Sequence, residues 1–173
     1  ALYCLMKFCL IFLTLILNCA YANSKNISIE LNNFENGTYK TIVWNGYPVF
    51  VFHLSKSQLN SIEKQNDEKV PSSQFKSWSS RYGEKIAEIL SKSTIESSRQ
   101  PNKGIVAVLA VGEDSGCKLE VLTNKNLLVD PCMPVTYTSN GIFTEGSSNK
   151  SWSLPAIPFN LSERKIHILN NLA

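Results

Sequence analysis

The strongest local constraint in this 173-residue chain is the pair Asn45-Gly46, which lies between two runs rich in β-branched and aromatic residues. Asn-Gly is a preferred sequence for a two-residue hairpin turn, because both turn positions need positive φ. The sequence therefore predicts an antiparallel hairpin with strands at residues 38–44 and 47–54. Pro48 cannot donate a backbone hydrogen bond, so we expect it at the start of its strand or at a sheet edge.

Further short segments have the composition of strands. Residues 27–31 alternate between apolar and polar side chains, which indicates a half-buried strand. Residues 104–111 are apolar throughout, which predicts a strand covered on both faces. Shorter candidates lie at residues 118–122, 126–129, 135–138, 142–144 and 165–169. Many short strands separated by turn signals are typical of an antiparallel sandwich or small barrel, so the chain is expected to be mostly β.

A helical insert is expected at about residues 55–91. Ser55 and Gln58 fit a capping box, so a short helix should follow as far as about Gln65. Five apolar residues then recur at helical spacing: Phe75, Trp78, Tyr82, Ile86 and Ile89. This spacing predicts a single helix over about residues 73–91, weakened by Gly83. The stripe could dock a partner, but packing against the chain's own sheet is the favoured interpretation.

Residues 1–22 differ from the rest of the chain. Residues 8–17 are almost wholly apolar, Lys7 precedes them, and the small-residue sequence Ala20-Tyr21-Ala22 follows. This pattern is typical of a secretory signal, and the apolar run is shorter than the ~20 residues of a membrane span. We therefore expect an exported protein, periplasmic or secreted, with residues 23–173 as one domain. A leader retained as a membrane anchor is the alternative.

Charge and motifs limit the function classes. The net charge is only +3 and the basic residues are not clustered, whereas nucleic-acid binding needs a basic stripe. The sequence has no G-x-S-x-G, H-E-x-x-H, P-loop or dinucleotide-binding motif, so nothing marks an enzyme of those classes. His53 and His167 are the only histidines, and both are expected to be strand residues rather than ligands.

The two cysteines outside the leader, Cys117 and Cys132, lie in two short sequence boxes. The boxes read Gly112-Glu113-Asp114-Ser115-Gly116-Cys117 and Asp130-Pro131-Cys132-Met133-Pro134-Val135. They resemble the cluster-binding loops C-T-H-L-G-C and C-P-C-H-G-S-H-Y-D of the Rieske iron–sulfur subunit of ubiquinol–cytochrome c reductase, the bc1-type respiratory complex. The run W-N-G-Y-P-V-F-V at residues 44–51 resembles the hairpin of the same family. The resemblance covers about residues 27–169 and implies a Rieske-like antiparallel fold.

The resemblance also implies what the site has lost. A Rieske [2Fe–2S] centre needs two cysteine and two histidine ligands. At the matching positions this chain has Gly112, Asp114, Asp130 and Met133. The two family cysteines that bridge the loops match Cys117 and Cys132, so the resemblance implies a disulfide and no bound cluster. Tyr137 matches a family tyrosine that hydrogen-bonds near the cluster.

The replaced positions leave other chemistry open. Glu113, Asp114 and Asp130 could bring three carboxylates together at the loop tips, and hard cations such as Ca²⁺ prefer oxygen ligands. A solvated acidic knob is the favoured interpretation, so no metal or cofactor is expected. A hydrolase built on these carboxylates would lack a nucleophile and a positioned base.

Two functional hypotheses follow. The first is an exported Rieske-like domain without a cluster that acts as a structural, binding or assembly component for a protein partner. The second is an electron-transfer or thiol-redox subunit of a bc1-type respiratory complex. The first is favoured because the scaffold is retained while all four ligand positions have changed, and function depends on the site rather than the fold. Catalytic cysteine pairs are usually closer in sequence, so a structural bridge is favoured for Cys117 and Cys132.

Overall fold

The structure, a computed structural model, describes residues 27–62, 70–95, 101–146 and 152–170. The expected leader at residues 1–22 lies outside these ranges. Within them the chain is mostly β, with ten strands in three antiparallel sheets and a few short helices. None of the described helices is long and apolar enough to cross a membrane.

The central sheet contains the predicted hairpin. Its strand order is β2 (Thr38–Trp44), β3 (Tyr47–His53) and β4 (Ile105–Leu109). Asn45 and Gly46 have φ values of 48° and 85°, so both adopt the left-handed conformation that a two-residue turn requires. The hairpin prediction is therefore confirmed. Pro48 is the second residue of β3, as expected for a residue without a backbone donor.

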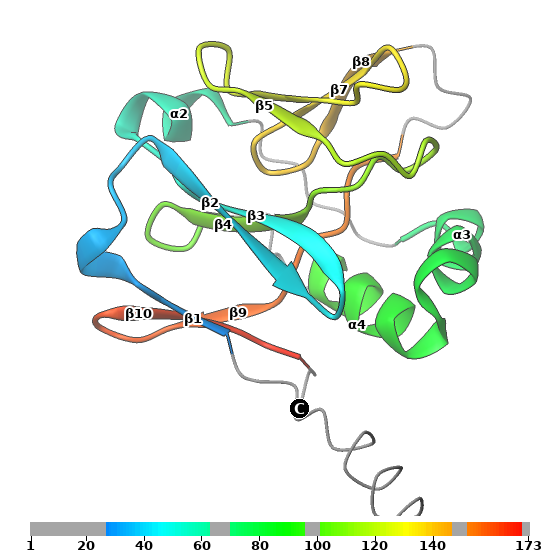
Figure 1. Cartoon of the computed structure of the whole chain (residues 1–173), viewed down its shortest axis with the longest axis horizontal. Helices are drawn as coiled ribbons and strands as arrows, with labels where there is room; N and C mark the ends of the chain where they lie inside the picture. The colour runs from blue at the N-terminus through cyan, green and yellow to red at the C-terminus, as the bar shows by residue number, and fades with distance from the viewer. Residues whose placement is uncertain (1–26, 63–69, 96–100, 147–151, 171–173) are drawn as a thin grey trace, which may run out of the picture.

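The other two sheets lie on either side of the central sheet (Figure 1). One has the strand order β1 (Ile27–Glu30), β10 (Lys165–Ile168) and β9 (Phe159–Leu161), and a short 3-10 helix, η1 (Leu31–Asn33), follows β1. The other contains four consecutive strands, β5 (Glu120–Leu122), β6 (Leu127–Val129), β7 (Val135–Thr138) and β8 (Phe143–Gly146). The sequence predicted all of these strands except β9, which has only three residues and no clear alternation.

Two apolar clusters fill the spaces between the sheets. Successive residues of β3 point to opposite faces, so Val49 and Val51 belong to one cluster while Phe50 and Phe52 belong to the other. All five residues of β4 are buried, which confirms that this strand is covered on both faces. The first cluster also contains residues of the helices and of the β1–β10–β9 sheet, and the second contains residues of the four-stranded sheet.

The helices are α2 (Lys56–Ser61), α3 (Ser72–Tyr82) and α4 (Glu84–Ile95). Ser55 and Gln58 form the predicted capping box, but α2 ends at Ser61, earlier than the expected end at about Gln65, which lies outside the described residues. The single helix predicted over residues 73–91 is wrong, because the chain breaks at Gly83 into two helices. Gly83 has φ 85° and ψ 153°, a conformation that only glycine adopts readily.

The aromatic stripe packs against the chain's own core, as the favoured interpretation held. Trp78, Tyr82 and Ile89 are buried in the first apolar cluster, and Phe75 and Ile86 are partly buried against it. The apolar faces of α3 and α4 are therefore covered by the protein's own core. The break in the chain at Gly83 lets both helices contact the same cluster.

Substitution of Gly83 by alanine should lower the free energy of unfolding by about 1–3 kcal/mol, the usual cost of placing a side chain in this backbone region. A Cβ at this position meets no atom within 4 Å, so the cost comes from the backbone alone. Urea denaturation measures the loss. Ser80→Ala, at an exposed position of α3, is the control and should change stability little. Equal stability of the two variants would contradict this account of the helix break.

Candidate functional site

The two sequence boxes form two hairpin loops. The first loop, residues 112–117, connects β4 to β5. Antiparallel backbone pairing between Val111 and Lys118 closes it. Within it the Gly112 N–H donates to the Cys117 carbonyl oxygen at 2.8 Å. The second loop, residues 130–135, connects β6 to β7, and the Asp130 N–H donates to the Val135 carbonyl oxygen at 3.0 Å. Each loop is therefore held by its own backbone hydrogen bonds.

A disulfide joins the two loops. It links Cys117 to Cys132, whose Cα atoms are 6.3 Å apart. Cys117 is half-buried and Cys132 is exposed, so the bridge lies at the surface of the site. Closing a loop over 15 positions of sequence contributes about 3 kcal/mol in the chain-entropy model. The bridge that the resemblance implied is thus present in the structure.

Asp130 joins the loops a second time, beside the disulfide. Its side chain is buried, with only 4% of its surface exposed. The Ser115 hydroxyl of the first loop donates to Asp130 Oδ2 at 2.5 Å, and the Cys132 N–H donates to Oδ1 at 2.9 Å. Ser115 Oγ in turn accepts a hydrogen bond from the Cys117 N–H at 3.0 Å. Both carboxylate oxygens are therefore satisfied by groups of the two loops.

The Asp130 carboxylate occupies the space next to Gly112. A Cβ placed at Gly112 would overlap Asp130 Oδ2 and would also be too close to Ser115 Oγ. Real side chains do not approach so closely, because the repulsion between overlapping atoms rises steeply. A residue with a side chain at position 112 would therefore require the side chains of Asp130 and Ser115, which are hydrogen-bonded to each other, to shift.

These residues do not fit an iron–sulfur cluster of the Rieske type. Such a cluster is held by thiolate and imidazole groups. Gly112 has no side chain, and Asp130 fills the space where one would begin. At the two positions that the sequence resemblance matches to imidazole ligands, the chain has the carboxylate of Asp114 and the thioether of Met133. Neither supplies an imidazole nitrogen.

The expectation of a solvated acidic knob is wrong. Glu113 is 2% exposed and Asp130 is 4% exposed, while Asp114 is half-buried. The indole N–H of Trp78 points between the two carboxylate oxygens of Glu113, at 2.8 and 2.9 Å. Buried carboxylates require such donors, because leaving water without compensation costs several kcal/mol. The sequence placed all three carboxylates at the loop tips but did not predict which of them packing would cover.

Helix α3 is bonded to the first loop at two points. One is the contact between Trp78 and Glu113, and the other is a hydrogen bond of 2.8 Å from Arg81 Nη1 to the Gly112 carbonyl oxygen. The sequence pattern places Trp78 in the apolar stripe but indicates neither contact, because 35 and 31 positions of sequence separate the partners. Ser115 was not predicted as a site residue, and its position inside the first box was the available signal.

Two buried tyrosines lie close to the acidic groups of the site. Burial raises the pKa of Tyr137 above its ordinary value; a hydrogen bond with the Glu113 backbone lowers it, and the charge of Glu113 raises it further. Burial, followed by the charge of Glu113, raises the pKa of Tyr82 to about 12, while Arg81 acts in the opposite direction. Both phenols therefore stay neutral to a higher pH than an exposed tyrosine would.

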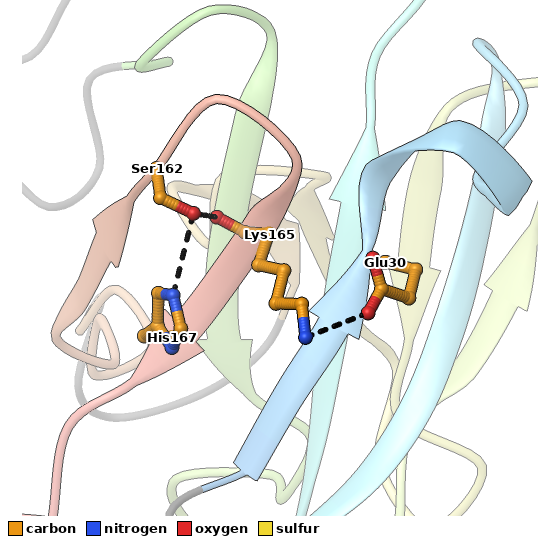
Figure 2. A network of polar contacts seen from close by, with 4 residues as sticks. All are labelled: Glu30, Ser162, Lys165 and His167. Atoms are coloured by element: carbon orange, nitrogen blue, oxygen red, sulfur yellow. Dashed lines mark hydrogen bonds and ion pairs between the residues drawn. The ribbon is translucent and has the colours of Figure 1, made fainter.

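Both histidines lie in strands, as predicted. His53 ends β3, and its Nδ1 is 2.6 Å from the Phe34 carbonyl oxygen. His167 lies in β10 and hydrogen-bonds to the Ser162 hydroxyl at 3.3 Å (Figure 2). On the same strand the Lys165 ammonium is 2.9 Å from the Glu30 carboxylate, and both side chains are about half exposed. Exposed pairs of this kind contribute little stability, so this network is a minor part of the pairing between β1 and β10.

Comparison with known proteins shows a shared fold. The sequence matches no protein-family model and no curated protein. Among solved structures, a chain of a hyperthermophilic respiratory Complex III is similar, with a TM-score of 0.52 and 14% identity over 96% of this chain and 94% of that one. A second structure, described as an oxidoreductase protein and small subunit of a nitrite reductase (NADPH), has a TM-score of 0.39 and 8% identity over 84% of this chain and 98% of that one. At 14% identity, the first similarity shows the fold alone.

Replacement of Trp78 by phenylalanine should destabilise the protein by removing the indole donor from the buried Glu113 carboxylate. A hydrogen bond to a charged group contributes about 1.5–3 kcal/mol, compared with about 1 kcal/mol for a neutral one. Trp44→Phe is the matched control, because the Trp44 indole is equally buried and donates to the neutral Leu169 carbonyl oxygen at 2.9 Å. Urea denaturation should show a loss about 1 kcal/mol larger for Trp78→Phe.

A double-mutant cycle isolates this contact. Trp78→Phe combined with Glu113→Gln should give a coupling energy of about 0.5–3 kcal/mol, the range found for residues in direct contact. A coupling energy near zero would show that the indole does not stabilise the carboxylate.

Alkaline pH should weaken the fold through Tyr82. A phenol with a raised pKa in the folded state favours folding below its unfolded value of 10, and this contribution is lost as the pH rises to about 12. The loss attributable to Tyr82 is about 3 kcal/mol at most, since each pKa unit corresponds to about 1.4 kcal/mol. Urea midpoints measured across this interval should fall less steeply for Tyr82→Phe, whereas Tyr39→Phe at the surface should behave as the wild type does. Identical slopes for the wild type and Tyr82→Phe would refute the assignment.

Proposed function

We propose that this chain is an exported Rieske-like domain without a [2Fe–2S] cluster, and that it acts as a structural or binding component of a respiratory assembly of the bc1 type. The observation that carries the proposal is the Asp130 carboxylate, which occupies the space beside Gly112 where a cluster ligand would begin. A fold does not by itself specify a reaction. A domain that has the Rieske-like fold but lacks the cluster ligands would therefore have a different function.

Two independent lines support the respiratory part of the proposal. The sequence boxes and the hairpin at residues 44–51 resemble the Rieske subunit of the bc1-type complex. The fold is shared with a chain of a respiratory Complex III over nearly the whole length of both proteins. A domain of this fold in such an assembly has other subunits as partners.

The loops also support a binding role over a catalytic one. The disulfide and the hydrogen bond from Ser115 to Asp130 cross-link the two loops, and the Cys132 N–H holds the Asp130 carboxylate in place, which makes the site a fixed surface. At the tip of the second loop Pro131, Cys132 and Pro134 are exposed, and such rigid residues lose little conformational entropy when a partner covers them. The apolar face of α3 is buried internally, so the second loop is the surface we assign to a partner.

A thiol-redox role is the second candidate, favoured by the exposure of Cys132. The Cys117–Cys132 pair would then accept two electrons from a thiol reductant and pass them to an oxidant. Reduction potentials distinguish the two roles, because structural disulfides lie below about −300 mV whereas catalytic ones lie higher. The separation of 15 positions between the cysteines favours the structural role.

The chain isolated anaerobically through an affinity tag, from the cells that make it, should contain far less iron and sulfide than a full [2Fe–2S] complement. It should also lack the visible absorption of a Rieske centre. The physical reason is the absence of thiolate and imidazole ligands at positions 112, 114, 130 and 133. On native gels of gently solubilised membranes it should migrate in an assembly with respiratory subunits.

A restored-ligand variant provides the control. The variant Gly112→Cys, Asp114→His, Asp130→Cys and Met133→His places the four family ligands on this fold, and we expect it to take up iron and sulfide under reconstitution conditions in which the wild type does not. A wild type that binds as much iron and sulfide as this variant would contradict the cluster-free proposal. Migration of the wild type as a lone monomer would contradict the assembly role.

A further inference from the structure

Three ligand atoms of metal-binding type converge where the two loops meet. They are the sulfur atoms of Cys117 and Cys132 and a carboxylate oxygen of Asp130, and all lie within 4.8 Å of one another. In the disulfide the sulfurs do not act as metal ligands, because the thiolate is the ligand form of cysteine. We propose that reduction of this disulfide opens a site for Zn²⁺, held by the two thiolates and the Asp130 carboxylate.

The dimensions of the site suit zinc. Zinc–sulfur bonds of about 2.3 Å and zinc–oxygen bonds of about 2.1 Å place the ligand atoms of a tetrahedral site roughly 3.5–4 Å apart. Reaching this geometry from the disulfide requires the two sulfurs to separate, while the carboxylate oxygen already lies within 4.8 Å of both. A Cα–Cα distance of 6.3 Å between Cys117 and Cys132 accommodates this change through side-chain rotation.

The loops remain in place when the disulfide opens, because other bonds hold them. Each loop has its own closing backbone hydrogen bond. Across the loops, the Ser115 hydroxyl still donates to the Asp130 carboxylate. The site is therefore organised by contacts that do not depend on the bond that is broken.

The Asp130 carboxylate is already oriented by hydrogen bonds and still has room to bind a metal. Each of its oxygens accepts one hydrogen bond, one from Ser115 and one from the Cys132 N–H, and an ionised carboxylate has about four acceptor positions. Free lone pairs thus remain for a metal, while Ser115 orients the carboxylate as outer partners do in metal sites. The missing side chain at Gly112 is what allows the carboxylate to reach this position.

The donor set selects the class of metal. Two thiolates and one carboxylate suit zinc, whereas calcium and magnesium prefer oxygen ligands alone. With three protein ligands and Cys132 exposed, the fourth tetrahedral position faces solvent and is available to water.

The redox step balances with a dithiol as reductant. The dithiol gives two electrons and two protons to the Cys117–Cys132 bond, which becomes two thiols, and the reductant itself becomes a disulfide. Zn²⁺ then displaces the two thiol protons and forms two zinc–sulfur bonds.

The test is titration of the reduced full chain with Co²⁺ and Zn²⁺. A phosphine serves as reductant, so that no added dithiol competes for the metal. We expect one Co²⁺ per chain with the sulfur-to-cobalt charge-transfer absorption of a thiolate complex, and displacement of that absorption by Zn²⁺. The oxidised chain should show neither. Circular dichroism before titration verifies that the reduced chain is folded.

Two variants test whether Asp130 and Ser115 contribute to metal binding or whether the two thiols bind the metal alone. Asp130→Asn and Ser115→Ala should weaken Zn²⁺ binding by about 10–100-fold, because a ligand or its orienting partner is lost. Asp114→Asn removes a neighbouring charge outside the three-ligand set and should change the affinity less than about threefold. Equal affinities for the wild type and Asp130→Asn, or failure of the folded, reduced chain to bind one Co²⁺, would overturn the proposal.

The reduction potential gives a second readout. Since zinc binds only the reduced form, each tenfold increase of free Zn²⁺ above its Kd should raise the midpoint potential by about 30 mV for this two-electron couple. A midpoint potential independent of Zn²⁺ would equally overturn the proposal.

Discussion

The cross-link between the two loops is the interaction on which the site depends. It consists of the Cys117–Cys132 disulfide and the adjacent hydrogen bond from the Ser115 hydroxyl to the Asp130 carboxylate. The first loop leaves the central sheet at β4, and the second lies between two strands of the four-stranded sheet. The cross-link therefore ties two of the three sheets together at their ends. Trp78 and Arg81 of helix α3 hydrogen-bond to the first of these loops. This region therefore connects the helix to both sheets.

Two buried carboxylates are the main electrostatic feature of this site. Here Glu113 and Asp130 are almost fully buried, and each receives strong donors: the Trp78 indole for one, and Ser115 with a backbone N–H for the other. Burial of a charge is tolerated only with such partners, and removing one partner costs much more than the pair contributes. The polar network thus fixes one arrangement of the loops.

The proposed function and the proposed zinc site have the same physical origin. With glycine at position 112, the Asp130 carboxylate fills the space beside it, which is incompatible with a cysteine ligand there. The same carboxylate then lies beside the two bridging sulfurs. The chain resembles a Rieske subunit in sequence and shares its fold with a chain of a respiratory Complex III. Under the two proposals it would serve as a binding component, and its loops would bind zinc only when the disulfide is reduced.

The sequence by itself determined the elements whose signals are local. The hairpin at Asn45-Gly46 and the capping box at Ser55 form as predicted, because backbone preferences within a few residues decide them. The positions of the two loops also followed from the sequence boxes. Gly83 was a local signal of a weak point in the helix, but only the structure shows that it divides the segment into two helices. Tertiary structure alone decided the pairing of the three-residue strand β9, since no short-range pattern indicates it. It alone decided the burial of Glu113 against Trp78, because those residues are 35 positions apart and meet only through packing of the whole domain.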